Sequence, residues 1–183
     1  MTNPLPREIY NPVQRDRVTF LKTADETDGE FTLIDLEVAP GGGNPLHFHA
    51  TFTERFTVEA GELGARIGKR RLTLRAGEGE LVPLRVVHRW FNPSAETVRA
   101  RVELRPGHSG FEESLRISYG LARDGRINAK GIPKSFLHLA VLAELSDTRV
   151  TGLLRWMNPL FGQFARIARS RGVEAELKRR YCT

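Results

Sequence analysis

Four side chains that can bind a metal ion lie in two short stretches of this 183-residue chain. His47, His49 and Glu54 fall within eight positions of one another, and His88 follows in an apolar run. Imidazole nitrogens and carboxylate oxygens are common ligands of divalent transition metals. Two histidines that are two residues apart on a strand point to the same face. We therefore interpret these four residues as a candidate metal site.

Both stretches have the composition of β-strands, with aromatic and β-branched residues around the candidate ligands. We expect Glu54 on a returning strand, 53–60, that neighbours the strand of His47 and His49. Three neutral imidazoles and one carboxylate would leave a six-coordinate divalent ion with about two open positions. Such a site suits Fe, Mn, Ni, Co, Cu or Zn, and the ligand set does not select among them.

The two stretches resemble the two sequence motifs of the cupin family. The first motif is matched at every position and the second at all but one. The matching residues are Gly41, His47, His49, Glu54 and Gly61, then Gly77, Pro83, His88 and Asn92. Arg85 stands where the family has a second glycine of the later motif. Because glycine reaches positive φ without strain and arginine does not, this departure leaves the turn before His88 in question.

The resemblance implies a mainly β protein: a cupin-type double-stranded β-helix, or jelly-roll barrel, followed by a C-terminal α-helical extension. We place an extended N-terminal arm at 1–16, the barrel at 17–107 and the helical extension at 108–183. Short alternating segments separated by turn residues agree with a barrel or sandwich.

After residue 107 the apolar period becomes helical, and we expect helices over 109–125, 132–145, 147–157 and 158–171. Ser109 and Glu112 have the spacing of a capping box, and Asp147 is the expected cap of the third helix. This tail either packs on the barrel or a second subunit, closes the barrel mouth as a lid, or lies on an anionic membrane.

The net charge of +6 is concentrated in that tail. Residues 1–104 carry 14 Lys/Arg and 15 Asp/Glu, which leaves 14 and 7 for residues 105–183. Basic surfaces attract phosphate polymers and anionic membranes, although most are solvated helix faces. We expect no nucleic-acid partner and do not favour membrane contact. The family resemblance implies a homodimer.

A cytoplasmic location is expected from two features of the sequence. The first 16 residues contain no apolar run typical of a signal peptide. The single cysteine, Cys182, excludes a disulfide within the chain and favours a reducing compartment.

An apolar, aromatic wall is predicted beside the metal ligands, because period-two spacing places five residues on their face: Phe52, Phe56, Val58, Val86 and Trp90. Such a wall suits a planar organic small molecule better than a sugar phosphate. The alternative is that these side chains simply fill a small barrel.

The cupin resemblance implies oxygenases, but also isomerases, lyases and non-catalytic binding proteins. Our first hypothesis is a metal-dependent dioxygenase that acts on a small organic molecule beside the metal. A non-redox isomerase or lyase, and a non-enzymatic ligand-binding or scaffold protein, are the alternatives. The resemblance also implies that Glu54 can serve as a catalytic base if it leaves the metal.

Overall fold

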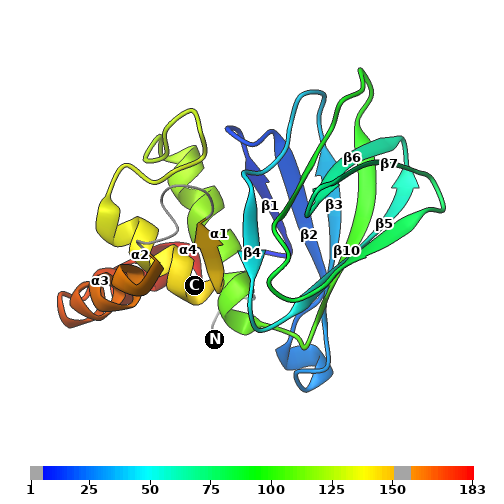
Figure 1. The fold of residues 1–183 in the computed structure, drawn as a ribbon. Coiled ribbons are helices and arrows are strands. Elements are labelled where there is room, and N and C mark those ends of the chain that lie inside the picture. Colours follow the sequence, from blue (N-terminus) through cyan, green and yellow to red (C-terminus); the bar gives the residue numbers. More distant parts are fainter. Residues whose placement is uncertain (1–5, 151–157) are drawn as a thin grey trace.

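Two antiparallel sheets form the barrel of the chain. The computed structural model describes residues 6–150 and 158–183. One sheet has the strand order β1-β2-β3-β10-β5-β8, and the other has the order β11-β4-β9-β6-β7 (Figure 1). The strands are β1 Glu8–Asn11, β2 Asp16–Lys22, β3 Thr32–Val38, β4 His47–His49, β5 Thr53–Ala60, β6 Glu62–Ile67, β7 Arg70–Arg75, β8 Gly79–Val82, β9 His88–Phe91, β10 Val98–Arg105 and β11 Thr148–Val150. This arrangement is the jelly roll that the sequence predicted.

The barrel core is made by side chains that alternate along its strands. Ile34 and Leu36 of β3 are buried, and so are Val102 and Leu104 of β10, with more exposed residues between them. The two strands pair directly, with Val102 opposite Ile34. A half-buried antiparallel strand shows this period of two, so the alternation seen in the sequence correctly identified both strands.

Part of the expected N-terminal arm is a strand of the barrel. Residues 8–11 form β1, which pairs with β2 in the register Ile9↔Val18. The Ile9 side chain is buried in the barrel core. This segment therefore extends the edge of the chain's own sheet.

Four α-helices lie beside the barrel in the described part of the chain (Figure 1). They are α1 Ser109–Arg123, α2 Phe136–Leu145, α3 Asn158–Ser170 and α4 Val173–Tyr181, and a short 3₁₀ helix, Asp25–Thr27, joins β2 to β3. The second helix begins four residues later than expected, because the Ser135 hydroxyl caps it by accepting a hydrogen bond from the His138 backbone N–H. Residue 133 instead bridges to Ile127.

Helix α1 separates two apolar cores. Its Phe111 and Tyr119 side chains belong to the barrel core, whereas Ile117 and Leu121 belong to a second core with α2 and α4. A helix that is buried on both sides is held firmly, because each side removes apolar surface from water. Helix α1 therefore forms a rigid partition between the barrel and the other helices.

The expected capping box at the start of α1 is absent. His108, not Ser109, is the N-cap, and its Nδ1 accepts from the Phe111 backbone N–H at 2.9 Å. Glu112 turns to the barrel, where Oε1 accepts from the Ala24 N–H at 2.7 Å and from the Thr32 hydroxyl at 2.6 Å. These partners, distant in sequence, replace the local bond and fasten α1 to the barrel.

The prediction of a helix over 147–157 is wrong for its first residues. Residues 148–150 form β11, which pairs antiparallel with β4 in the register Thr148↔His49. Asp147 adopts the left-handed region, with φ of 50°, and so turns the chain out of α2. The free edge of β4 offers hydrogen-bond partners that sequence periodicity does not reveal. The rest of the expected helix, 151–157, lies outside the described residues.

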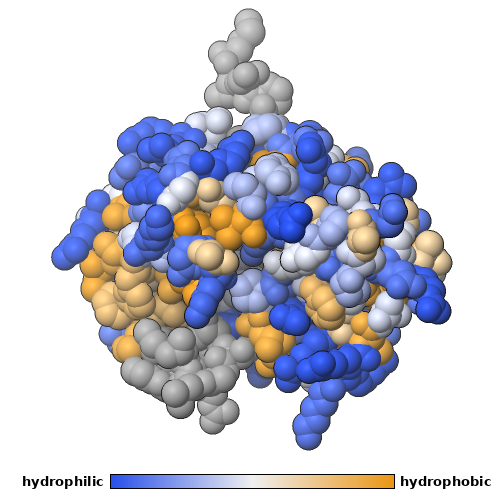
Figure 2. Space-filling view, turned by 90° about the horizontal axis from the view of Figure 1, so that it is seen from above, coloured by the Kyte–Doolittle hydropathy of each residue, from blue (hydrophilic) through white to orange (hydrophobic). Residues whose placement is uncertain are grey.

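The surface mixes polar and apolar residues. Figure 2 shows apolar patches on the face seen from above, separated by hydrophilic side chains. The large apolar side chains that are exposed come from both the barrel and the helices: Tyr10, Leu21, Leu81, Leu84, Ile132, Phe136 and Ile167. No helix among the described residues has the length and apolar character needed to cross a membrane.

Candidate metal centre and adjoining cavity

The four candidate ligands converge inside the barrel. His47, His49, Glu54 and His88 each offer one ligand atom, and these atoms all lie within 4.8 Å of one another. Histidines 47 and 88 are register partners on β4 and β9. The sequence correctly predicted that these side chains point to one interior, and a cluster of this kind can hold a metal ion.

The strand relationship expected for Glu54 was wrong. Glu54 lies on β5, which belongs to the sheet opposite that of β4. Only residues 50–52 join the two strands, and they carry the chain from one sheet to the other. Closure of the barrel, rather than pairing of neighbouring strands, thus brings the carboxylate to the histidines.

Backbone carbonyls orient two of the imidazoles. The His47 Nδ1 lies 2.8 Å from the Pro45 carbonyl oxygen, and the His88 Nδ1 lies 3.0 Å from that of Val86. Because a carbonyl only accepts, both Nδ1 atoms carry hydrogen and both Nε2 atoms face the cluster. Such bonds fix the tautomer and ring direction of metal-binding histidines.

His49 is buried, and its Nε2 is unsatisfied. This atom has no hydrogen-bond partner among the described residues. The same atom lies 4.0 Å from the Glu54 Oε2. A buried polar atom without a partner is costly, and a metal ion bound by Nε2 would satisfy it. The donor set therefore fits a divalent transition metal.

The cluster's charges are strongly coupled. Burial alone would raise the pKa of Glu54, but the hydrogen bond from His88, together with the charges of the three histidines, lowers that pKa to about 2. Burial and the neighbouring His88 and His49 lower the pKa of His47 to about 3. The hydrogen bond to Glu54 outweighs burial and raises the pKa of His88. A carboxylate and a neutral imidazole are both ready to bind a cation.

Arg85 keeps the turn that a glycine was expected to make. Its φ is 61°, in the left-handed region, and its backbone N–H donates to the His49 carbonyl at 2.7 Å. The turn before His88 is therefore formed despite the arginine, and it ties the loop of His88 to the strand of His49. The arginine carries the backbone strain that glycine would avoid.

Asp147 fixes the loop that leaves His49. Its Oδ2 accepts from the Ala50 N–H at 2.5 Å, the Thr51 N–H at 2.8 Å and the Thr51 hydroxyl at 3.0 Å. The residue is buried, and these bonds outweigh burial and lower its pKa. The junction of α2 and β11 thus supports the candidate metal centre, a role that sequence analysis did not assign.

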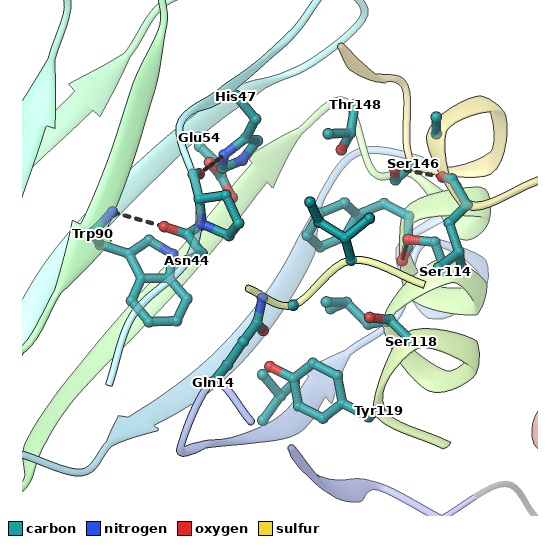
Figure 3. Close-up of a pocket in the computed structure, with 18 of the residues that line it drawn as sticks. Gln14, Asn44, His47, Glu54, Trp90, Ser114, Ser118, Tyr119, Ser146 and Thr148 are labelled. Atoms are coloured by element: carbon teal, nitrogen blue, oxygen red, sulfur yellow. Dashed lines mark hydrogen bonds between the residues drawn. The ribbon is translucent and has the colours of Figure 1, made fainter. Parts of the chain in front are cut away.

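A cavity of about 370 Å³ adjoins the cluster (Figure 3). Its walls come from both parts of the chain: His47, Glu54 and Trp90 from the barrel, and residues such as Ser118 and Tyr119 from α1. Part of α2 also lines it. The helical tail therefore contributes to the pocket: residues of α1 and α2 line the cavity beside the candidate ligands.

The five predicted pocket residues divide between the cavity and the core. Trp90 lines the cavity, as predicted. Phe52 stacks on the His49 ring with centroids 4.3 Å apart. Phe56 and Val58 are buried in the barrel core, and Val86 packs against that core. These four residues do not line the cavity. Residues of α1 and α2 line it instead, and only the packing of these helices on the barrel could have identified them.

The fold and the cluster define a jelly-roll barrel with a histidine-rich interior site. Residues 34–110 match the family model described as "Cupin domain". Residues 34–110 therefore carry a cupin domain, and residues 111–183 lie beyond the matched segment. A comparison with curated proteins found no match.

Solved structures resemble the barrel. An RmlC-like cupin from Shewanella frigidimarina is 18% identical, with 56% of this chain and 86% of that chain covered and a TM-score of 0.49. A predicted oxalate decarboxylase from Thermotoga maritima is 14% identical, with 50% and 80% covered and a TM-score of 0.48. A cupin domain of an XRE family transcriptional regulator from Enterobacter cloacae is 25% identical, with 50% and 96% covered and a TM-score of 0.45.

Proposed function

We propose that this cupin is a metal-dependent enzyme of the oxygenase type, acting on a small organic molecule bound in the cavity. One observation carries the proposal: His47 and Glu54 are both candidate ligands and part of the cavity wall. A molecule in the cavity would therefore lie directly beside an ion held by the cluster. Catalytic metal sites differ from closed structural sites by keeping such open positions.

The chain's residues have distinct roles in this proposal. His47, His49, Glu54 and His88 hold the ion, which when bound supplies Lewis-acid or redox chemistry. The Pro45 and Val86 carbonyls keep two imidazoles aimed at it. Glu54 acts as a ligand rather than as the catalytic base expected from family resemblance. A carboxylate with a pKa near 2 accepts protons poorly at neutral pH.

The cavity wall favours an uncharged organic substrate. Much of the wall is apolar: Val18, Ile34, Leu36, Val102, Leu115 and Leu139 are among its residues. Arg149 is the one cation among the described wall residues, and it lies 3.3 Å from Asp147 and 3.9 Å from Glu144. A phosphate in the cavity away from the metal cluster would lack a free cation among the described residues, so a sugar phosphate whose phosphate does not bind the metal is a poor fit.

Elemental analysis of the purified protein beside a His47→Ala/His88→Ala double variant tests the proposal. We expect about one equivalent of a redox-active metal in the wild type and none in the variant. Substrate-dependent O₂ uptake with catechols, flavonols or diketones would then support the oxygenase activity. Metal in neither protein, even after reconstitution, would overturn it.

Two results would redirect the proposal to the alternatives. Bound zinc, with turnover that needs no oxygen, would favour an isomerase or lyase. Ligand binding without turnover under any metal would favour a binding protein. The homodimer stays a prediction, which light scattering on the purified chain would test.

A further inference from the structure

The cavity has a polar corner away from the metal cluster. Figure 3 shows Gln14, Ser118 and Tyr119 in the lower part of the cavity, and His47 and Glu54 at its upper left. All five residues line the same space. Many of the other lining side chains are apolar, and the remaining polar ones are Asn44, Ser114, Ser146, Thr148 and Arg149.

Ser118 has an uncommitted hydroxyl in this corner. On α1 the Ser114 hydroxyl donates to the Phe111 carbonyl at 2.7 Å, and at the C-cap of α2 the Ser146 hydroxyl donates to the Leu142 carbonyl at 2.7 Å. The Ser118 hydroxyl, which is also on α1, makes no such bond to any described residue. It is therefore free both to donate and to accept.

The other two groups have opposite polarity when Asp16 is ionised. Burial raises the pKa of Asp16 to about 7, and above that pH the Tyr119 hydroxyl donates to the Asp16 Oδ2 at 2.5 Å, which leaves its own oxygen as an acceptor. The Gln14 Oε1 accepts from the Asn11 Nδ2 at 3.2 Å, which leaves the Gln14 Nε2 as a donor with no partner among the described residues. The corner thus combines one acceptor, one donor and one group of either kind.

A ligand hydroxyl matches this set. It can donate to Tyr119 while it accepts from Gln14 or Ser118, whereas a carbonyl would leave the Tyr119 lone pair unmatched. A carboxylate would face the same lone pair and would bring a charge to a corner where the described residues supply no cation. Asp16 lies behind Tyr119, fully buried, and adds no positive charge.

We propose that the cavity selects a small, mainly apolar molecule that binds the metal at one end and presents an uncharged hydroxyl to Gln14, Ser118 and Tyr119 at the other. This inference rests on the proposed function, because it takes the cluster as the site of the ligand's first end. It adds a second recognition point, supplied by α1 and the N-terminal segment rather than by the cupin motifs.

Matched catechols test the inference on the full chain loaded with Zn²⁺, which does not oxidise them. One pair is 4-(2-hydroxyethyl)catechol and 4-propylcatechol, and a longer pair is 4-(4-hydroxybutyl)catechol and 4-pentylcatechol. Each pair has one chelating head and tails of equal length that end in hydroxyl or methyl. Calorimetric Kd values are measured for the wild type, Ser118→Ala, Gln14→Met and Tyr119→Phe. Ser114→Ala is the control on the same helix.

We expect the wild type to bind the hydroxyl member of at least one pair about tenfold more tightly. Ser118→Ala should reduce that preference several-fold without weakening the methyl probe, and Gln14→Met and Tyr119→Phe should act likewise. Ser114→Ala should keep it, because that hydroxyl is already bonded within the helix.

The failures of the two proposals are distinguishable. Equal binding of the hydroxyl and methyl probes in both pairs overturns the hydroxyl assignment and leaves the metal-dependent function standing. A preference that survives all three corner variants also overturns the assignment. Zinc-loaded wild type that binds none of the four catechols contradicts both.

Discussion

The His88 Nε2 donates to the Glu54 Oε2 at 2.8 Å, and this bond joins the two sheets of the barrel. The Nδ1 of the same ring donates to the Val86 carbonyl. Because both partners are acceptors, His88 carries two hydrogens while no metal is bound. The candidate centre thus holds a hydrogen bond between His88 and Glu54. An incoming cation must displace the hydrogen of this bond before both residues can bind it.

Metal binding should therefore release a proton from His88. The hydrogen bond to Glu54 raises the pKa of His88 above its usual value of 6.5 despite burial, so most rings carry both hydrogens at pH 6.5, and a bound ion takes the place of the Nε2 hydrogen. Calorimetry at pH 6.5 in two buffers of different ionisation enthalpy should therefore show a net release of protons on Zn²⁺ binding. Identical heats in the two buffers would contradict the assignment.

Protonation of His47 should destabilise the metal-free protein in acid. His47 has a folded pKa of about 3, below its value of 6.5 when unfolded, so this residue binds more protons in the unfolded chain between these values. Its contribution to the free energy of unfolding should fall as pH drops from 6.5 towards 3, whereas Asp16, whose pKa burial raises to about 7, contributes with the opposite sign. Glu54, with a pKa lowered from 4.5 to about 2, adds a loss of the same sign as that of His47 below pH 4.5.

Urea titrations of the metal-free protein from pH 7 to pH 4 measure this effect. His47→Gln removes the titrating ring and should flatten the decline between pH 6.5 and 4.5. If the variant declines as steeply as the wild type, His47 is not the source.

Arg85→Gly should stabilise the protein. A non-glycine residue in the left-handed region costs roughly 1–2 kcal/mol, and the added flexibility of glycine in the unfolded chain returns about half of that. We expect a net gain of about 0.5–1 kcal/mol in guanidinium unfolding, with metal binding unchanged. Arg71→Gly, on an exposed position of β7, is the matched control and should destabilise by a similar amount. A loss of stability in Arg85→Gly would show that its side chain matters more than its backbone.

Asp147 should support metal binding from a distance. Asp147→Ala removes all three hydrogen bonds to residues 50 and 51, so the loop after His49 loses its anchor. We expect metal affinity to fall about 10- to 100-fold, as is typical when groups that orient ligands are lost. Asn keeps an acceptor and tolerates positive φ, so Asp147→Asn should retain most of the affinity.

Competition with a chelating dye measures the metal affinity of both variants, and unfolding of the metal-free proteins separates affinity from stability. Wild-type affinity in Asp147→Ala would remove the proposed role. Equal losses in the Ala and Asn variants would point to the charge of Asp147 rather than to its hydrogen bonds.

Local pattern identified the barrel and the candidate ligands because both depend on short-range geometry. His47 and His49 share a face through the two-residue period of a strand, and the motif spacing added Glu54 and His88. The alternation on β3 and β10 revealed the buried face for the same reason. The helices at 109–123 and 158–170 followed from their apolar period.

Contacts between distant segments decided the rest. The segment 148–150 is a strand because the edge of β4 was free to pair, and its own residues allow either state. Glu112 accepts a hydrogen bond from Thr32, 80 positions away in the sequence. This long-range bond forms in place of the capping bond expected at the start of α1. Arg85 adopts a backbone conformation that its residue type disfavours, held by a bond to His49.

The sequence by itself determined the cupin domain, the barrel and the cluster of candidate metal ligands, because these follow from residue types at fixed local spacing. Only the tertiary structure decided that Glu54 comes from the opposite sheet and that α1 and α2 wall the cavity. It also decided which hydroxyls, such as that of Ser118, make no hydrogen bond to any residue that the structure describes. The physical reason is that hydrogen bonding and burial depend on neighbours in space, and closing the barrel against the helices selects those neighbours.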